Sequence, residues 1–255
     1  MKRLLTTILL TATVSLGILA QSTSVIRYAY TAKFQKSKIT ALIWYEEDEN
    51  GDLSGEIIYT SSKHQTPIRV FGRVYDLGGI VRHTLFEYQA DGEQSGHFEI
   101  DRDAKTSDLS GQWGDMRNDD SQRRYTMRLT RIPFPEDKGG TFTPAFDIQG
   151  KYVYNYQHHF KGNQGGSVVI NHLKGDRDKK YVHISKYDPQ IAEYEGNLIP
   201  QGNIFSTTLE ECGYSFTLTV YNDFVRVRTT SSTDKEYDCF GAFTTLDGFY
   251  LKVSD

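Results

Sequence analysis

The sequence is poor in cysteine and proline, with 2 and 6 residues respectively among 255. The two cysteines do not form a C-x-x-C pair, and no histidine flanks either of them at the spacing of a zinc site. Both absences argue against a thiolate metal site and against a dithiol redox centre. We therefore expect no metal and no cofactor.

Common catalytic motifs are also missing. The chain has no G-x-S-x-G motif, no glycine-rich phosphate loop and no H-E-x-x-H motif. These motifs mark many serine hydrolases, nucleotide-binding proteins and zinc proteases. Their absence favours a protein that binds its target non-covalently, as a binding or inhibitor module. A hydrolytic enzyme whose site does not show as a motif is the alternative.

Clustered positive charge is missing as well. Asp and Glu number 33 against 29 Lys and Arg, which gives a formal net charge of −4. An acidic, mixed surface argues against a nucleic-acid partner and against an anionic membrane surface. Beyond the N-terminus, no stretch is apolar over the ~20 residues that a membrane-spanning helix needs.

The N-terminus does contain an apolar run, from Leu4 to Leu19. Lys2 and Arg3 precede the run, and the small residue Ala20 follows it. This order is typical of a secretory signal peptide in residues 1–20, although a buried N-terminal helix is an alternative. We expect cleavage after Ala20 and export to the periplasm or the medium, with a net charge of −6 once Lys2 and Arg3 are removed.

Export makes a disulfide the expected state of Cys212 and Cys239. The bridge would close a loop of 28 residues. On a chain-entropy estimate, that closure stabilises the fold by about 3.5 kcal/mol.

Alternation with a period of two dominates the rest of the chain, and no amphipathic helix is evident after the N-terminus. Seventeen Tyr and 14 Phe supply enough apolar surface for sizeable cores. Sixteen segments rich in β-branched or aromatic residues are bounded by Gly, Asp, Asn or Ser, and we predict each to be a strand. They are residues 25–34, 38–47, 54–60, 67–74, 79–88, 95–102, 109–113, 123–132, 151–160, 166–174, 180–187, 192–199, 203–210, 214–221, 224–230 and 247–253.

Residues 132–146 hold three of the six prolines and a Gly-Gly pair, a composition typical of a linker. The flanking parts, 21–131 and 147–255, are almost equal in length. The sequence therefore predicts an all-β protein with two tandem antiparallel domains, either lipocalin-like barrels or sandwiches. One continuous all-β domain is the alternative.

Residues 45–59, YEEDENGDLSGEIIY, resemble a calcium loop because Asp48, Asn50 and Asp52 are two residues apart. An EF-hand loop counted from Asp48 needs glycine at its sixth position and glutamate at its twelfth, where Leu53 and Tyr59 stand. The Asn50-Gly51 pair instead predicts a type I′ hairpin turn with the acidic residues at a solvated tip. A weak calcium site is the alternative.

The most aromatic strand begins the second domain. Alternation places Tyr152, Tyr154, Tyr156 and His158 on one face, which would point into a barrel. This face is the candidate binding site for an unidentified small molecule, glycan or extracytoplasmic protein. The alternative is that these side chains only fill the core.

Three other groups of polar residues stand out. His83 and Glu87 share a face and could act as general acid and base, which is the enzyme alternative. Arg226 and Arg228 alternate with valines and are interpreted as an edge or solvent-facing basic pair without a function. Histidines of the second half, His158, His159, His172 and His183, could meet at a metal, but their spacing matches no known zinc motif.

Residues 212–252 carry a pattern of their own. Cys212 precedes a hairpin, Cys239 is followed by Phe240 and Gly241, and the turn Asp247-Gly248 leads into a closing aromatic strand. In this the chain resembles exported bacterial lipocalin-like β-proteins, some of them similar to periplasmic lysozyme inhibitors. The resemblance implies a binding module, and no inhibitory motif carries over to particular residues.

Overall fold

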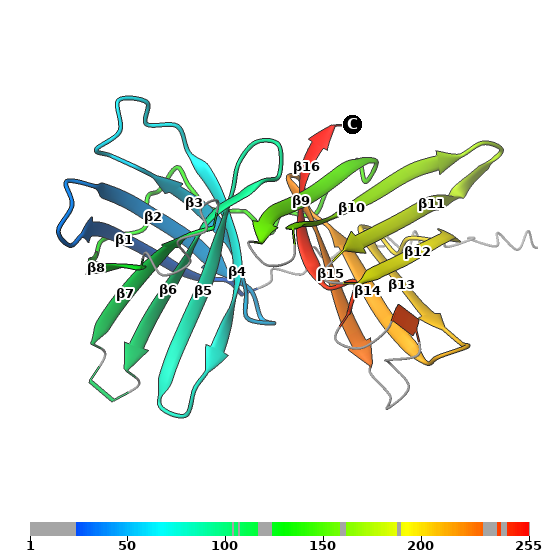
Figure 1. The fold of residues 1–255 in the computed structure, drawn as a ribbon. Coiled ribbons are helices and arrows are strands. Elements are labelled where there is room, and N and C mark those ends of the chain that lie inside the picture. The colour runs from blue at the N-terminus through cyan, green and yellow to red at the C-terminus, as the bar shows by residue number, and fades with distance from the viewer. Residues whose placement is uncertain are drawn as a thin grey trace, which may run out of the picture.

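The computed structural model shows an all-β protein made of two antiparallel eight-stranded barrels in tandem, as the sequence predicts. Figure 1 shows the barrels side by side, with β4 of the first facing β9, β15 and β16 of the second. The structure describes residues 24–103, 105–106, 108–116, 124–158, 162–187, 190–231, 239–240 and 244–254.

The first barrel is closed, and its strands pair in the order of the sequence. Strand β1 pairs with β2 on one side and with β8 on the other, where Tyr30 lies opposite Arg131 and Phe34 opposite Met127. Closure removes both sheet edges, which would otherwise be free to pair with other chains. The strands are β1 (Ile26–Phe34), β2 (Thr40–Glu47), β3 (Asp52–Ile58), β4 (Ile68–Asp76), β5 (Ile80–Tyr88), β6 (Gln94–Asp103), β7 (Leu109–Asp115) and β8 (Arg124–Arg131).

The second barrel is nearly closed, and its terminal strands pair with each other. Its first strand, β9, pairs with its last, β16, and the sheet ends at β12 and β13, which are consecutive in the chain. The strands are β9 (Gly150–His158), β10 (Gly162–Leu173), β11 (Asp176–Tyr187), β12 (Ile191–Leu198), β13 (Ile204–Leu209), β14 (Tyr214–Val220), β15 (Phe224–Ser231) and β16 (Gly248–Ser254).

The turn between β2 and β3 is a hairpin, but two details of its prediction were wrong. Gly51 has a positive φ of 73° and donates its N–H to the carbonyl of Asp48, whereas Asn50 does not have the positive φ of a type I′ turn. A three-residue loop with glycine in the left-handed region fits this geometry. The acidic residues are only partly solvated: Glu49 is exposed, but Asp48 and Asp52 are both buried, and Asp48 accepts the backbone N–H groups of Asn50 and Asp52.

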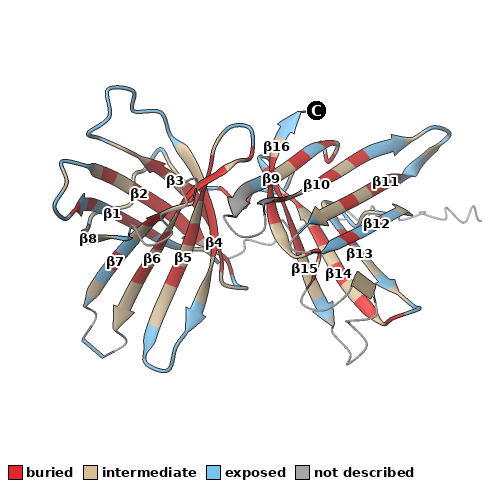
Figure 2. Ribbon diagram, in the orientation of Figure 1, coloured by how far each residue is buried: buried red, intermediate tan, exposed pale blue. Residues whose placement is uncertain are grey.

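Each barrel has its own apolar core, and the core of the second barrel extends onto the outer face of the first. Buried side chains such as Ile43, Tyr45 and Phe98 fill the first barrel. The core of the second barrel also includes Phe71 and Tyr88, which stand on the outer face of the first. Figure 2 shows buried positions on the strands where the barrels meet. The two barrels therefore share buried apolar surface.

Two further segments join the barrels. In the segment between β8 and β9, Thr141 donates its N–H to Glu46 of the first barrel at 2.8 Å, and Ala145 donates its N–H to the carbonyl of Val220 in the second at 3.1 Å. The turn after β5 reaches β9, where the N–H of Asn155 donates to the carbonyl of Gly92 at 3.0 Å. A connection held at both ends fixes the barrels more firmly than a free linker does.

Candidate binding cleft between the barrels

The facing walls of the two barrels are aromatic. Phe71 on β4 points out of the first barrel, and its ring centroid lies 4.6 Å from that of Phe224 and 5.6 Å from that of Phe249. Tyr88 on β5 packs edge-on against Phe71 at 5.0 Å, and its hydroxyl donates to the carbonyl of Phe249 at 3.2 Å. Buried aromatic pairs of this kind are worth ~0.5–1.5 kcal/mol each beyond their area. They hold the two walls in a fixed relation.

A buried ion cluster lies beside these rings. Asp52, the first residue of β3, is 2% exposed, and Arg226 on β15 is 5% exposed. Arg226 Nε donates to Asp52 Oδ2 at 3.0 Å, and Arg228 Nη2 donates to the same oxygen at 2.6 Å. Arg73 Nε stands 3.5 Å from the other oxygen, Oδ1. One carboxylate of the first barrel therefore binds two arginines of the second.

Arg226 has further partners that hold its guanidinium in place. Its Nη1 donates to the carbonyls of Val227 and Gly248, and its guanidinium carbon lies 4.6 Å from the centroid of the Phe249 ring. Removing a charge from water is expensive, and only good hydrogen-bond geometry offsets the cost. The contacts of Arg226 surround its charge with acceptors and an aromatic ring, and they place a fixed positive charge where the barrels meet.

A cleft of about 450 Å³ opens next to this cluster, between the wall of the first barrel and the mouth of the second. Its lining combines aromatic rings with cations. The rings are those of Tyr75, Phe86, Tyr88, Tyr154 and Phe249, the charged residues are Arg73, Lys186, Arg226 and Asp247, and the remainder are Gly72, Gln94, Met116 and Gly248.

The polar groups of the cleft are held by neighbouring residues. Lys186 Nζ donates to the backbone carbonyl of Asp247 at 2.9 Å, and the Asp247 carboxylate accepts the N–H and the hydroxyl of Thr229. Gln94 Nε2 donates to the Tyr88 hydroxyl at 2.7 Å. The lining carries three cations, Arg73, Lys186 and Arg226, and one carboxylate, Asp247, so positive charge is in excess there in a chain that is acidic overall.

The predicted aromatic face of β9 divides in the structure. Tyr152 is fully buried, and its hydroxyl donates to the carbonyl of Gln149 at 3.3 Å, so it belongs to the core. Tyr154 is in edge contact with Tyr250 at 5.1 Å and also lines the cleft. The side chains of Tyr156 and His158 lie outside the described part of the chain. A binding role for this face stays a prediction. Tyr154 is the residue of this face that lines the cleft.

His83 lies inside the first barrel, where it is almost completely buried. Its Nδ1 is 2.8 Å from the Tyr45 hydroxyl, and its ring packs edge-on against that of Tyr28 at 4.8 Å. Burial disfavours the charged imidazolium, and with the nearby positive charge of Arg102 it lowers the pKa of His83 to about 4. The side chain is therefore neutral at pH 7.

Glu87 also points into the first barrel, four residues further along β5. Strand geometry separates the two Cα positions by about 13 Å, so they do not form an acid–base pair. The Glu87 carboxylate instead accepts hydrogen bonds from Tyr59, from Ser95 at 2.9 Å and from Trp113 Nε1 at 3.3 Å. This arrangement satisfies a buried carboxylate and gives no support to catalysis by His83 with Glu87.

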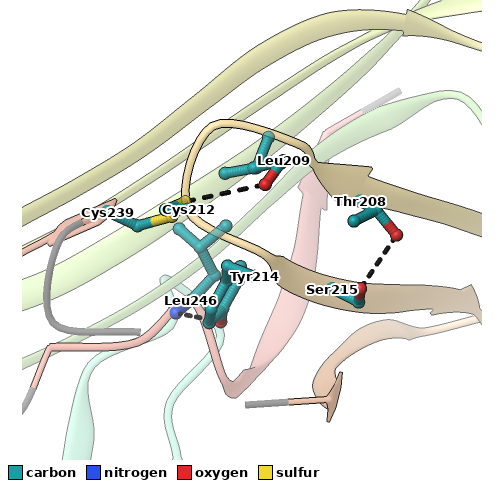
Figure 3. Close-up of a disulfide and its surroundings, with 7 residues drawn as sticks. All are labelled: Thr208, Leu209, Cys212, Tyr214, Ser215, Cys239 and Leu246. Atoms are coloured by element: carbon teal, nitrogen blue, oxygen red, sulfur yellow. Dashed lines mark hydrogen bonds between the residues drawn. A yellow bond between two sulfur atoms is a disulfide. The ribbon is translucent and has the colours of Figure 1, made fainter. Parts of the chain in front are cut away.

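The cysteines form the predicted disulfide. Cys212 and Cys239 are bonded to each other, with their Cα atoms 5.7 Å apart (Figure 3). In the same region the N–H of Leu246 donates to the Tyr214 hydroxyl at 3.1 Å, and the ring of Phe240 packs edge-on against Tyr214. The bridge thus ties the β13–β14 turn to the segment that leads towards β16.

No group of three or more His, Cys, Asp or Glu side chains that could hold a metal occurs among the described residues. His183 Nε2 is paired with Glu193 Oε1 at 2.7 Å. His159 lies outside the described residues. Within that same part of the chain, no helix is long and apolar enough to cross a membrane.

The interpretation of Arg226 as solvent-facing was wrong. Its side chain is buried because the outer face of β15 is covered by the first barrel, through Asp52 and Phe71. One signal was available in the sequence: Phe224 shares a face with Arg226 and Arg228, and a large aromatic residue marks a face that has a packing partner.

Comparisons with known proteins add little. No protein-family model matches the chain, and no curated protein matches it. A solved structure of the Pseudomonas aeruginosa MucA/MucB complex aligns with 92% of this chain and 89% of that one, at 10% identity and a TM-score of 0.20. At that TM-score the likeness carries no argument about fold or function.

Proposed function

We propose that this chain is an exported, non-catalytic binding protein whose ligand occupies the cleft between the barrels. The ligand would carry a negatively charged group joined to an apolar or ring-shaped body. One observation supports this above all: aromatic rings and cations line the same cleft of about 450 Å³.

Two kinds of side chain in the lining would bind different parts of the ligand. Tyr75 is 47% exposed, and together with Phe86 and Phe249 it offers ring faces that bind apolar or ring-shaped groups by surface burial. Lys186 and Arg73 provide the charge for an anionic group at the same site. Because the shared core, the ion cluster and the connecting segment already fix the walls, little ordering cost would remain for binding.

A pair of probes tests the proposal. The aromatic sulfonate 8-anilinonaphthalene-1-sulfonate has both features, and N-phenyl-1-naphthylamine has the same rings without the charge. We expect the sulfonate to bind to the folded protein at one site, at least tenfold more tightly than the neutral dye, and more weakly at high salt. Equal binding of the two dyes would contradict a role for the cations.

Matched variants locate the probe. Lys186→Gln should weaken sulfonate binding about tenfold and leave the neutral dye unaffected, and Tyr75→Ala should weaken both dyes. Lys179→Gln and Tyr187→Ala are the controls, because these exposed residues lie outside the cleft. The proposal fails if the cleft variants bind like the controls while all four proteins melt like the wild type.

The natural ligand would then be sought by screening acidic glycans and fatty acids. Lysozymes would be screened as candidate protein ligands, because of the C-terminal resemblance. Turnover of any hydrolase substrate that is lost in Glu87→Gln but kept in Lys186→Gln would favour the enzyme instead. Neither result depends on the dyes.

Export is the second part of the proposal. The order of Lys2 and Arg3, the apolar run and Ala20 supports a signal peptide, and the Cys212–Cys239 bridge supports an oxidising compartment. The intact mass of the protein from its native host should correspond to residues 21–255 with two hydrogens lost to the bridge. A mass that retains residues 1–20, or two free thiols, would contradict export.

A further inference from the structure

The second barrel has a seam. Strands β12 and β13 are separated by only residues 199–203, yet among the described residues no strand ladder joins them. A single bridge between Gln201 and Ile204 closes the loop itself. Within the described part of the chain, β12 pairs with β11 alone and β13 with β14 alone, so two edge strands flank the seam. Their outer N–H and C=O groups can pair with another strand.

The seam widens away from the loop into a hollow of about 710 Å³. Strand β12 contributes Glu193, strand β13 contributes Thr208 and Leu209, and the disulfide with Phe240 lies at the same place. Because Cys212 is bonded to Cys239 and Phe240 packs on Tyr214, this end of the seam is held by covalent and core contacts. The site is therefore built into the fold.

The rim of the seam is acidic. Glu193 and Glu195 point outward from β12, and Glu210 and Glu211 follow directly after β13; all four are exposed. Glu193 also has a partner on the neighbouring strand, His183, whose Nε2 lies 2.7 Å from Glu193 Oε1. Four like charges on two facing edges repel one another and attract a basic partner.

We propose that the seam accepts an extended segment of a partner polypeptide as an additional strand, which pairs with β12 and β13 and completes the barrel. The segment would span six to eight residues, because β13 has six and β12 has eight. Alternation of side chains would place its basic residues outward against the glutamates and its apolar residues inward. Strand addition to a sheet edge is an established mode of peptide recognition.

This second site is independent of the cleft. The cleft lies against β4 and β5 of the first barrel, whereas the seam lies between β12 and β13. The two proposals therefore use different probes and different variants.

The test uses a capped octapeptide of alternating lysine and valine. We expect it to bind to the oxidised full-length chain and to slow amide hydrogen exchange in β12 and β13 at least tenfold, with no change in β3. An octapeptide of alternating glutamate and valine should not bind. A lysine–valine peptide with every second amide N-methylated should also fail, because it cannot pair with both edges.

Charge reversal gives the matched control. Glu193→Lys with Glu195→Lys should exchange the preference, so that the glutamate peptide binds and the lysine peptide does not. Glu49→Lys with Glu136→Lys, at exposed positions outside the seam, should leave the preference unchanged.

Several outcomes would overturn the proposal. N-methylated peptide that binds as well as its parent would show charge attraction without strand pairing. Slow exchange in β12 and β13 before any peptide is added would show that the edges are already paired, within the chain or with a second copy. Absence of binding by the lysine peptide would equally end the proposal.

Discussion

Arg226 Nε lies 3.0 Å from Asp52 Oδ2, and this bond joins two barrels across 174 residues of sequence. An ion pair elsewhere between the barrels is Arg69 with Asp223, at 2.5 Å, where the Asp223 side chain is 60% exposed. The two pairs have the same chemistry and different solvent access. They allow the role of burial at this interface to be measured directly.

Asp52→Asn should destabilise the protein by about 3–5 kcal/mol, because Arg226 would stay buried without a counter-charge. Asp223→Asn should cost less than about 1 kcal/mol, since water screens that pair. Urea unfolding of both variants and the wild type at pH 7 gives the comparison. Equal, small losses would mean that the ion cluster does not hold the barrels together.

The burial of Asp52 could not be identified from the local sequence, and for Arg226 the one hint is Phe224 on the same strand face. Asp52 follows a turn signal that suggests a solvated tip, and Arg226 alternates with Val225 and Val227 as on a half-exposed strand. Both readings treat one barrel alone. Burial arises because a second barrel covers both positions, and no local periodicity contains that information.

Stability should fall as the pH drops from about 6.5 towards 4, because of His83. Burial lowers its pKa in the folded protein to about 4, whereas the unfolded chain takes up the proton near 6.5. The unfolded state therefore binds more protons in this window. Between pH 7 and pH 5, the free energy of unfolding falls by about 2 kcal/mol because of His83.

His83→Gln removes this contribution. We expect the difference in unfolding free energy between pH 7 and pH 5, from urea titrations, to be smaller in the variant by about 2 kcal/mol. Carboxylates titrate in both proteins and cancel in the comparison. An identical pH dependence in the two proteins would show that His83 is accessible to protons in the folded state.

Residues 147–255 should fold alone as a β-domain with a strand-type circular dichroism spectrum and a cooperative melt. The isolated piece should be less stable than the whole chain, because Phe224 and Phe249 lose the cover of Phe71 and Tyr88. An unfolded or aggregated product under oxidising conditions would indicate one continuous folding unit.

Much of the fold could be predicted because alternation is a local property. In β14, YSFTLTV, buried and half-buried residues alternate along the whole strand, and the sequence shows the same pattern. All sixteen predicted strands occur. Strand pairing could not be predicted in the same way, because it is not a local property. In the sequence β12 and β13 look like an ordinary hairpin, and they become edge strands because β9 pairs with β16.

The candidate site was predicted in one part only. Tyr154 was recognisable because it belongs to the most aromatic alternating face in the chain, which was predicted to point into a barrel. The remaining walls, from Tyr75 to Phe249, come from strands distant in sequence and meet only through the packing of the barrels.

The central claim, that a charged ring compound binds between the barrels, can be tested with two methyl groups. Beyond residue 1 the chain has two methionines: Met116 lines the cleft, and Met127 is buried in the core of the first barrel. With ¹³C-methyl methionine labels, assigned through Met116→Leu, titration with 8-anilinonaphthalene-1-sulfonate should shift the Met116 methyl resonance in step with binding and leave Met127 unchanged. A shift of Met127 alone, or saturable binding that moves neither methyl, would contradict the account.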